Sequence, residues 1–143
     1  MSTIFVELEA LTNAAHRSEF KRDFSVYDSL ASDDKPIQWA IDLLELLNQT
    51  HVVVVLTVRN ELHRMATEDW LMENNVACDH LLMRPEGDYT PAIDLKKALV
   101  LEHFKGRDDK MEEETFAIWS NHEATIEAFR EDGFNVIQTG WGE

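Results

Sequence analysis

The segment that most constrains the fold of this chain is Val52–Asn60, which reads VVVVLTVRN. A run of apolar, β-branched residues is typical of a strand that is buried on both faces, as in a parallel sheet. The run ends in Thr57, and Arg59 follows. Ligands of open α/β folds bind beyond the carboxyl ends of the strands, where a hydroxyl and a cation suit a phosphate. The segment therefore predicts a buried strand that ends at a ligand site.

Strand-like and helix-like segments alternate along the rest of the chain. We expect strands at residues 3–8, 52–56, 80–83, 115–119 and 135–139. Asp34 is expected to cap a first long helix with Pro36 in its first turn, and further helices are expected at 60–74, 91–104 and 123–131, the last ending before Gly133. Alternation of this kind predicts βαβ units, and so an α/β three-layer sandwich with a parallel sheet of about five strands. A length of 143 residues predicts a single domain over 1–143.

The net charge of −15 is unusual, with 28 acidic residues against 13 Lys and Arg. Such a chain repels nucleic acid and anionic membranes at long range. Two interpretations remain open: the charge serves solubility, or it forms an acidic surface that docks onto a basic protein. The acidic clusters at 108–109 and 112–114 are expected to be a solvated loop and helix start.

Cysteine and histidine usage indicates neither a disulfide nor a metal site. Cys78 is the only cysteine, and none of the six histidines has a spacing typical of metal ligands. The lone cysteine favours a reducing cytoplasm, and we expect neither a metal nor a cofactor. No apolar run reaches about 18 residues, and a basic-then-apolar leader is lacking, so no membrane span is expected. Among the tryptophans, Trp39, Trp70 and Trp119 are expected in the core, and Trp141 is expected to be exposed and available to a partner.

Several short motifs occur in a particular order at the expected strand ends and helices. They are Thr57-Val58-Arg59, then Arg64, Thr67 and Trp70-Leu71, then Leu82-Met83-Arg84-Pro85 with Gly87-Asp88, then Lys96, and finally Phe129-Arg130 with Gly133 and Ile137-Gln138. In order and spacing they resemble the phosphatase domain of bacteriophage-type polynucleotide kinase/phosphatases, in the haloacid dehalogenase superfamily. The resemblance covers nearly the whole chain, but no P-loop is present. It implies a haloacid dehalogenase-like fold without a large cap, and a bacteriophage source.

The resemblance also implies where catalytic carboxylates should stand. In that superfamily an aspartate nucleophile and an acid/base aspartate two residues later follow the first strand, and Mg²⁺ neutralises the phosphoryl charge. The spacing to His16-Arg17 places Val6 at the nucleophile position and Leu8 at the acid/base position. A shift of one residue would place Glu7 and Glu9 there, but would turn the side chains of the strand to the opposite faces. We therefore favour Val6 and Leu8 as degenerate catalytic positions.

The motif after the fourth strand is degenerate as well. Ser120 and Asn121 stand where the family has two aspartates that complete the metal site. The cationic and hydroxyl positions persist, and they form a possible relic anion site or are kept for local ion pairs: Thr57, Arg59, Arg84 and Lys96. Without the carboxylates no aspartyl-phosphate can form.

The sequence therefore favours a catalytically inactive phosphatase-like protein over an enzyme. We expect a phage-encoded acidic interaction or inhibitor protein that acts in the host cytoplasm on a nucleic-acid-handling protein with a basic surface. Direct contact with nucleic acid or membrane is not expected, and a homodimer is left open. One alternative is a binding module for a nucleotide or a phosphorylated nucleic-acid end in the relic pocket. Another is a divergent polynucleotide 3′-phosphatase that uses Glu7 and Glu9.

Overall fold

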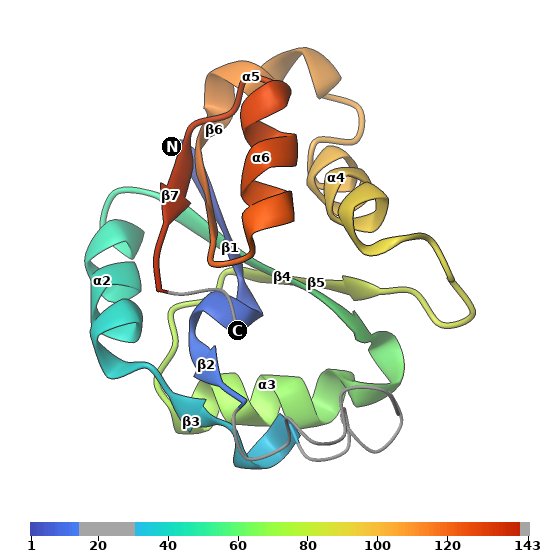
Figure 1. Cartoon of the computed structure of the whole chain (residues 1–143). Coiled ribbons are helices and arrows are strands. Elements are labelled where there is room, and N and C mark those ends of the chain that lie inside the picture. Colours follow the sequence, from blue (N-terminus) through green and yellow to red (C-terminus); the bar gives the residue numbers. More distant parts are fainter. Residues whose placement is uncertain (15–30, 141–143) are drawn as a thin grey trace.

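A five-stranded parallel sheet forms the centre of the molecule (Figure 1). The computed structural model describes residues 1–14 and 31–140. The strand order is β5-β4-β1-β6-β7, and each strand is parallel to its neighbours. The strands are β1 (Thr3–Glu7), β4 (Val52–Asn60), β5 (His80–Arg84), β6 (Thr115–Ser120) and β7 (Val136–Gln138).

Helices cover both faces of this sheet, so the expected three-layer α/β sandwich is confirmed (Figure 1). On one face lie α2 (Gln38–Asn48) and α3 (Arg64–Glu73), and on the other α4 (Ala92–His103) and α6 (Glu123–Glu131). The shorter elements are η1 (Leu8–Ala10), β2 (Thr12–Asn13), η3 (Ala31–Asp33), β3 (Lys35–Pro36), η4 (Glu61–His63), η5 (Asp108–Lys110) and α5 (Met111–Glu114). Within the described residues, no helix has the length and apolar content needed to cross a membrane.

Side chains of β1 alternate between the two faces of the sheet, as a pleated strand requires. Ile4 and Val6 join the apolar cluster under α2 and α3, whereas Phe5 joins the cluster under α4 and α6. The neighbouring strand β4 alternates in the same way, with Val53 and Val55 on the first face. By this alternation the side chain of Glu7, at the end of β1, lies on the α4 face.

The start of the first long helix differs from the sequence-based prediction. Lys35–Pro36 forms β3, which pairs antiparallel with β2, and the helix begins at Gln38 without a cap from Asp34. A residue before proline favours extended backbone, and this explains why Lys35 continues as a strand. Asp34 is buried and forms an ion pair with Arg59 at 3.7 Å, so its role is tertiary and not local.

One predicted core position is wrong. Trp39 lies on the outer side of α2 and is 55% exposed. Trp70 and Trp119 are buried, as predicted. The reference positions His16 and Arg17, and Trp141, which is predicted to be exposed, lie outside the described residues.

Candidate functional site

Polar side chains converge at the carboxyl ends of β1, β4 and β6. Glu7 ends β1, Thr57 lies in the last part of β4, and Ser120 ends β6. Lys96 of α4 reaches the same place from one face of the sheet, and Glu9 comes from η1, directly after β1. These residues occupy the edge of an α/β sheet where ligands ordinarily bind.

The carboxylate of Glu7 is buried, and both of its oxygens have partners. Oε1 lies 2.8 Å from Nζ of Lys96, and the hydroxyl of Ser120 donates to Oε2 at 2.9 Å. Each of these three side chains is almost fully buried, with Glu7 only 3% exposed. A buried ion pair is tolerated when further hydrogen bonds satisfy its remaining polar atoms, and Ser120 supplies one of them.

Further hydrogen bonds extend this arrangement to α6. Lys96 Nζ donates to Thr125 Oγ1 at 2.8 Å, and that oxygen lies 2.9 Å from Nδ1 of His122. The backbone N–H of His122 donates to Ser120 Oγ at 3.0 Å, which returns the connection to Glu7. We call these five residues the Glu7 network: Glu7, Lys96, Ser120, His122 and Thr125.

The carboxyl group of Glu9 lies beside this network in a different state. Thr57 Oγ1 donates to its Oε1 at 2.8 Å, while Oε2 is buried and no group of the described residues donates to it. Burial raises the pKa of Glu9 and the nearby Glu7 carboxylate adds to this, against the opposing effect of the Arg59 charge. Glu9 is therefore poised to hold a proton more readily than an ordinary glutamic acid.

The four predicted anion-binding residues do not form a free cationic site. Lys96 is paired with Glu7, and Thr57 donates to Glu9. Arg59 contacts Asp34 and donates from Nη1 to the hydroxyl of Thr67 at 3.1 Å. Arg84 donates to three backbone carbonyls, those of Val58, Asp88 and Thr90, and so shapes its own loop.

The predicted catalytic register is wrong in the structure. Val6 and Leu8 are fully buried in the apolar cluster under α2 and α3, away from Lys96 and Ser120. Glu7 and Glu9, the alternative that follows from a shift of one residue, are the side chains that reach the site. The sequence contained a signal for this register. In a strand, residues two apart share a face, so Glu7 lies on the same face as Phe5 and opposite to Val6. Thr125 was missed altogether, since a single threonine on a helix gives no signal of its own.

Comparisons with solved structures identify the fold. No protein-family model and no curated protein sequence matches this chain. A structure of a Pnkp1/Rnl/Hen1 complex contains a chain that aligns with all of this one at a TM-score of 0.82 and 22% identity. A structure of the Pnkp1/Rnl/Hen1 RNA repair complex gives a TM-score of 0.82 at 21% identity. This chain spans 47% and 44% of those two chains.

Another solved structure is matched over nearly its whole length. An HAD family enzyme from Bacteroides thetaiotaomicron, in its magnesium complex, aligns with all of this chain at a TM-score of 0.63 and 16% identity, over 95% of its own length. This protein has the haloacid dehalogenase-like fold. At such low sequence identities the comparison shows a shared fold only. The chemistry of the site must therefore be judged from the residues of this chain.

Those residues do not fit a magnesium ion. Mg²⁺ requires oxygen ligands in near-octahedral geometry, mostly carboxylates and waters. The two oxygens of Glu7 already contact Lys96 and Ser120. Ser120 at the end of β6 and Asn121 directly after it stand where carboxylates would be needed. Among the described residues, no three His, Cys, Asp or Glu side chains converge as a metal site. The ammonium group of Lys96 instead supplies the positive charge beside Glu7.

Proposed function

We propose that this haloacid dehalogenase-like protein is a pseudophosphatase, which has lost phosphoryl transfer and acts by binding another protein. The observation that carries the proposal is the state of Glu7, the carboxylate at the end of β1. Its two oxygens are held by Lys96 Nζ and Ser120 Oγ at 2.8 and 2.9 Å. A nucleophilic carboxylate must present a lone pair to phosphorus, and here the carboxylate is buried while Lys96 and Ser120 both withdraw electron density from it, which weakens it as a nucleophile.

Charge balance supports the same proposal. A transferring phosphoryl group carries negative charge that must be neutralised by cations. At this site two glutamates face one lysine, since Arg59 is paired with Asp34 and Arg84 with backbone carbonyls. An incoming phosphate would therefore meet carboxylates without enough positive charge to offset them. The same count weighs against a relic pocket for a nucleotide or a phosphorylated nucleic-acid end.

The proposed partner is a protein with a basic surface. A chain with a net charge of −15 attracts basic proteins and is repelled by bare nucleic acid. A structural neighbour of this fold belongs to a complex of several proteins, which is in keeping with a protein partner. We propose that the target is a nucleic-acid-handling protein of a bacteriophage host, inhibited in the host cytoplasm by this acidic chain.

A divergent phosphatase is the second candidate, and one observation favours it. Glu7 and Glu9 are two residues apart and lie beside Thr57 and Lys96, as the nucleophile and acid/base residues of such an enzyme would. The raised pKa of Glu9 also suits a proton donor.

The test is a phosphatase assay on a 3′-phosphorylated oligonucleotide and on p-nitrophenyl phosphate, with and without Mg²⁺. We expect no turnover from the full chain above that of its Glu7→Gln variant. The matched control is Glu112→Gln, which removes the same charge from an exposed position in α5. Magnesium-dependent turnover that is lost in Glu7→Gln and kept in Glu112→Gln would establish the divergent phosphatase instead.

The partner is tested by capture on the immobilised full chain from a bacterial lysate, beside a binding assay with duplex and single-stranded DNA. We expect a basic protein to be retained and to elute with salt, and no binding to either DNA near 150 mM salt. Tight binding to bare DNA would contradict the proposed mode of action.

A further inference from the structure

We propose that the outer side of α2 is the docking surface, and that its occupant is a basic, amphipathic segment of a partner protein. This inference rests on the proposed function, because it gives a place and a chemistry to the protein contact. Three features of the described residues support it: an exposed apolar stripe, acidic groups around it, and an acidic pocket where β3 leads into α2.

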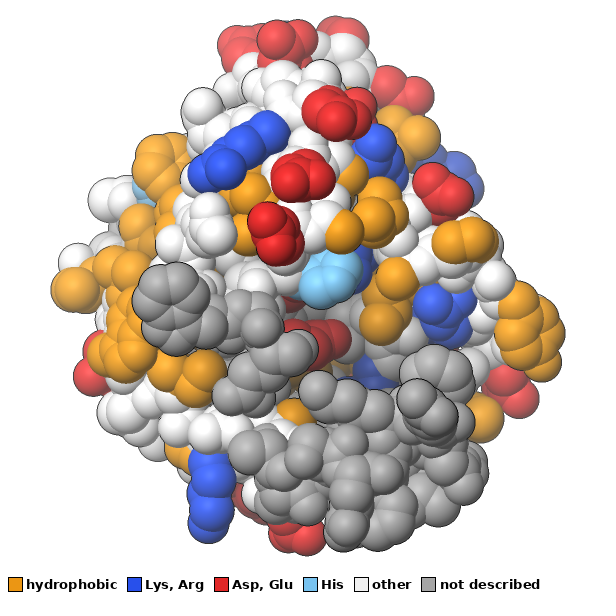
Figure 2. Space-filling model, in the orientation of Figure 1, with side chains coloured by type: hydrophobic (Ala, Val, Ile, Leu, Met, Phe, Trp, Pro, Cys, Tyr) orange, Lys and Arg blue, Asp and Glu red, His pale blue; other side chains and the backbone are white. Residues whose placement is uncertain are grey.

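The apolar stripe consists of Trp39, Leu43 and Leu46. Positions i, i+4 and i+7 lie along one side of a helix, so these three side chains form a continuous row. Trp39 is 55% exposed and Leu46 is 62% exposed, while Leu43 packs partly against the core. Figure 2 shows hydrophobic side chains gathered on the left flank of the molecule, where α2 lies in Figure 1. We call this row the α2 stripe.

The core of the sheet does not need the α2 stripe. Ala40, Ile41 and Leu44 form the buried side of the helix and already close the cluster above β1 and β4. An exposed tryptophan at one end of a row with two leucines leaves a large apolar area in water, and aromatic anchors of this kind often dominate the energy of protein interfaces. The stripe therefore offers binding energy that folding has not used.

Acidic groups flank the stripe and favour an occupant with positive charge. Asp42 and Glu45 are exposed on α2, and residues 37–51 contain no Lys or Arg. At the far end of the helix, Asn48 Nδ2 donates to the carboxylate of Asp79 at 2.9 Å, which places another acid there. A partner with lysines or arginines beside apolar residues would complement this arrangement.

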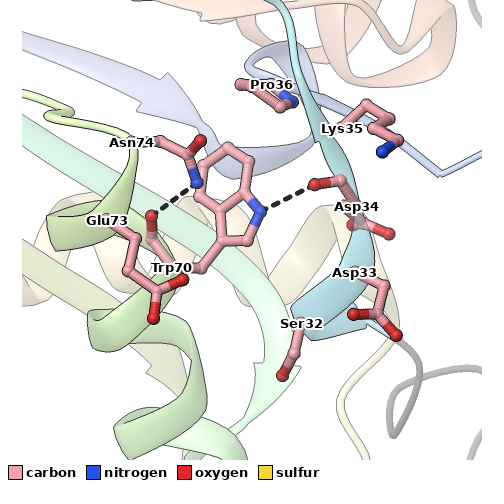
Figure 3. Close-up of a pocket in the computed structure, with 8 residues that line it drawn as sticks. All are labelled: Ser32, Asp33, Asp34, Lys35, Pro36, Trp70, Glu73 and Asn74. Carbon is pink, nitrogen blue, oxygen red and sulfur yellow. Dashed lines mark hydrogen bonds between the residues drawn. The ribbon is translucent and has the colours of Figure 1, made fainter.

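A pocket at the other end of α2 has the same sign of charge (Figure 3). It lies between η3, β3 and α3, has a volume of about 540 Å³, and is lined by the exposed acidic residues Asp33 and Glu73. Asp34 also lines it, but its carboxylate is paired with Arg59. Trp70 forms its floor and donates from Nε1 to the backbone oxygen of Asp34 at 2.9 Å. Among the described residues that line it, Lys35 is the only basic one. Because β3 leads from this pocket into α2, one basic side chain of a docked segment can enter it.

A second copy of this chain fits the surface poorly. Two copies would each bring a charge of −15, and a symmetric contact would place Asp42 and Glu45 of both copies at one interface. A row of three apolar side chains also offers less than the roughly 800 Å² that each partner buries in a standard interface. A short basic segment avoids the repulsion between like charges and needs only a small apolar area.

The probe is a fluorescent synthetic helical peptide with leucines on one face and lysines on the other, titrated into the full chain and followed by anisotropy. We expect Trp39→Ser with Leu46→Ser to weaken binding at least tenfold. Asp42→Asn with Glu45→Gln should weaken it severalfold and reduce its dependence on salt. Matched controls are Met65→Ser with Met72→Ser, which are exposed apolar residues of α3, and Asp109→Asn with Glu112→Gln. Both controls should bind as the unaltered chain does.

Equal losses of peptide affinity in the α2 variants and in the controls would overturn the proposal. They would show that binding depends only on the net charge of the chain. Equal binding of a peptide with glutamates in place of the lysines would also overturn it. A dimer in sedimentation that is lost with Trp39→Ser and Leu46→Ser would assign the stripe to a second copy. If that variant fails to fold, amide hydrogen exchange of the unaltered chain is measured with and without the peptide. Bound peptide must slow the exchange of residues 38–48, and unchanged exchange there would overturn the proposal. Phosphatase turnover would overturn the proposed function but not a positive peptide result, so the two failures are distinguishable.

Discussion

Glu7 and Lys96 illustrate how this protein accommodates charge inside its sheet. Removing two ions from water is costly, and their attraction offsets this cost only when neighbouring groups complete the hydrogen bonding. Here the hydroxyls of Ser120 and Thr125 lie 2.9 and 2.8 Å from the paired charges. The pair is therefore stable as a unit and vulnerable to the loss of either member.

We predict that Lys96→Met lowers the free energy of unfolding by about 3–5 kcal/mol, because it leaves the Glu7 carboxylate buried without a counter-charge. The double variant Glu7→Leu with Lys96→Met should recover most of this loss. Urea unfolding of the three proteins measures the difference. A single variant as stable as the unaltered chain would show that the pair is not buried as described.

Glu9 gives a prediction about pH. Burial raises its pKa from the ordinary 4.5, so the folded chain binds this proton more tightly than the unfolded chain does. The stability that the group contributes is full below pH 4.5 and is lost as the pH rises through the raised value. Glu9→Gln should therefore melt at a higher temperature than the unaltered chain at pH 7, with a smaller difference near pH 4.

A suitable comparison is Glu61, whose pKa is lowered, chiefly by its hydrogen bond with Arg64. Its stabilising effect is present above the ordinary pKa and is lost as the pH falls through the lowered value. Glu61→Gln should thus melt at a lower temperature than the unaltered chain at pH 7. A higher melting temperature for both variants would contradict the assignment of the Glu9 effect to burial.

Among the elements, α6 shows how a local sequence ends a helix. Gly133 has φ of +88°, and its N–H donates to Arg130 O at 3.0 Å while Phe134 N donates to Phe129 O at 3.0 Å. This pair of bonds is the Schellman motif, and the rings of Phe129 and Phe134 meet at 5.5 Å as its usual apolar contact. The predicted stop before Gly133 is confirmed.

We predict that Gly133→Ala costs about 1–2 kcal/mol of stability, because an L-residue with a β-carbon disfavours the left-handed region. Space does not contribute to this cost, since a β-carbon at this position has nothing within 4 Å. Gly133→Asn should cost less, as asparagine tolerates that conformation. Chemical unfolding of both variants tests the order, and a larger loss for asparagine would contradict it.

For the whole molecule, the charge of −15 opposes compactness through self-repulsion. Surface ion pairs such as Lys97 with Asp132, at 2.9 Å, relieve only part of it. We predict that raising NaCl from about 10 to about 150 mM raises the melting temperature, because the screening length falls from about 30 to about 8 Å.

The control for this effect is Asp109→Asn with Glu112→Gln, which lowers the net charge to −13 (−15 plus the two charges removed). Its melting temperature should respond less to salt. A melting temperature that falls with added salt would show that ion pairs outweigh the repulsion.

By itself, the sequence determined the order of elements and the class of fold. The β-branched run in β4, the alternation of strands and helices, and Gly133 after α6 are local signals, and local signals suffice to predict a parallel sheet covered on both faces. The motif comparison also identified Thr57, Lys96 and Ser120 as residues that lie at the ends of the strands and in α4. These three do meet at one site.

Only the tertiary structure decided which charges lie together and which faces are covered. The pleat of a strand repeats every two residues, so a shift of one residue exchanged Val6 and Leu8 for Glu7 and Glu9 at the site. The pairing of Lys96 with Glu7 and of Arg59 with Asp34 joins residues 89 and 25 positions apart, which no local pattern encodes. Trp39 is exposed for the same reason: helical periodicity defines an apolar side, but only the position of α2 on the sheet decides how much of that side is buried.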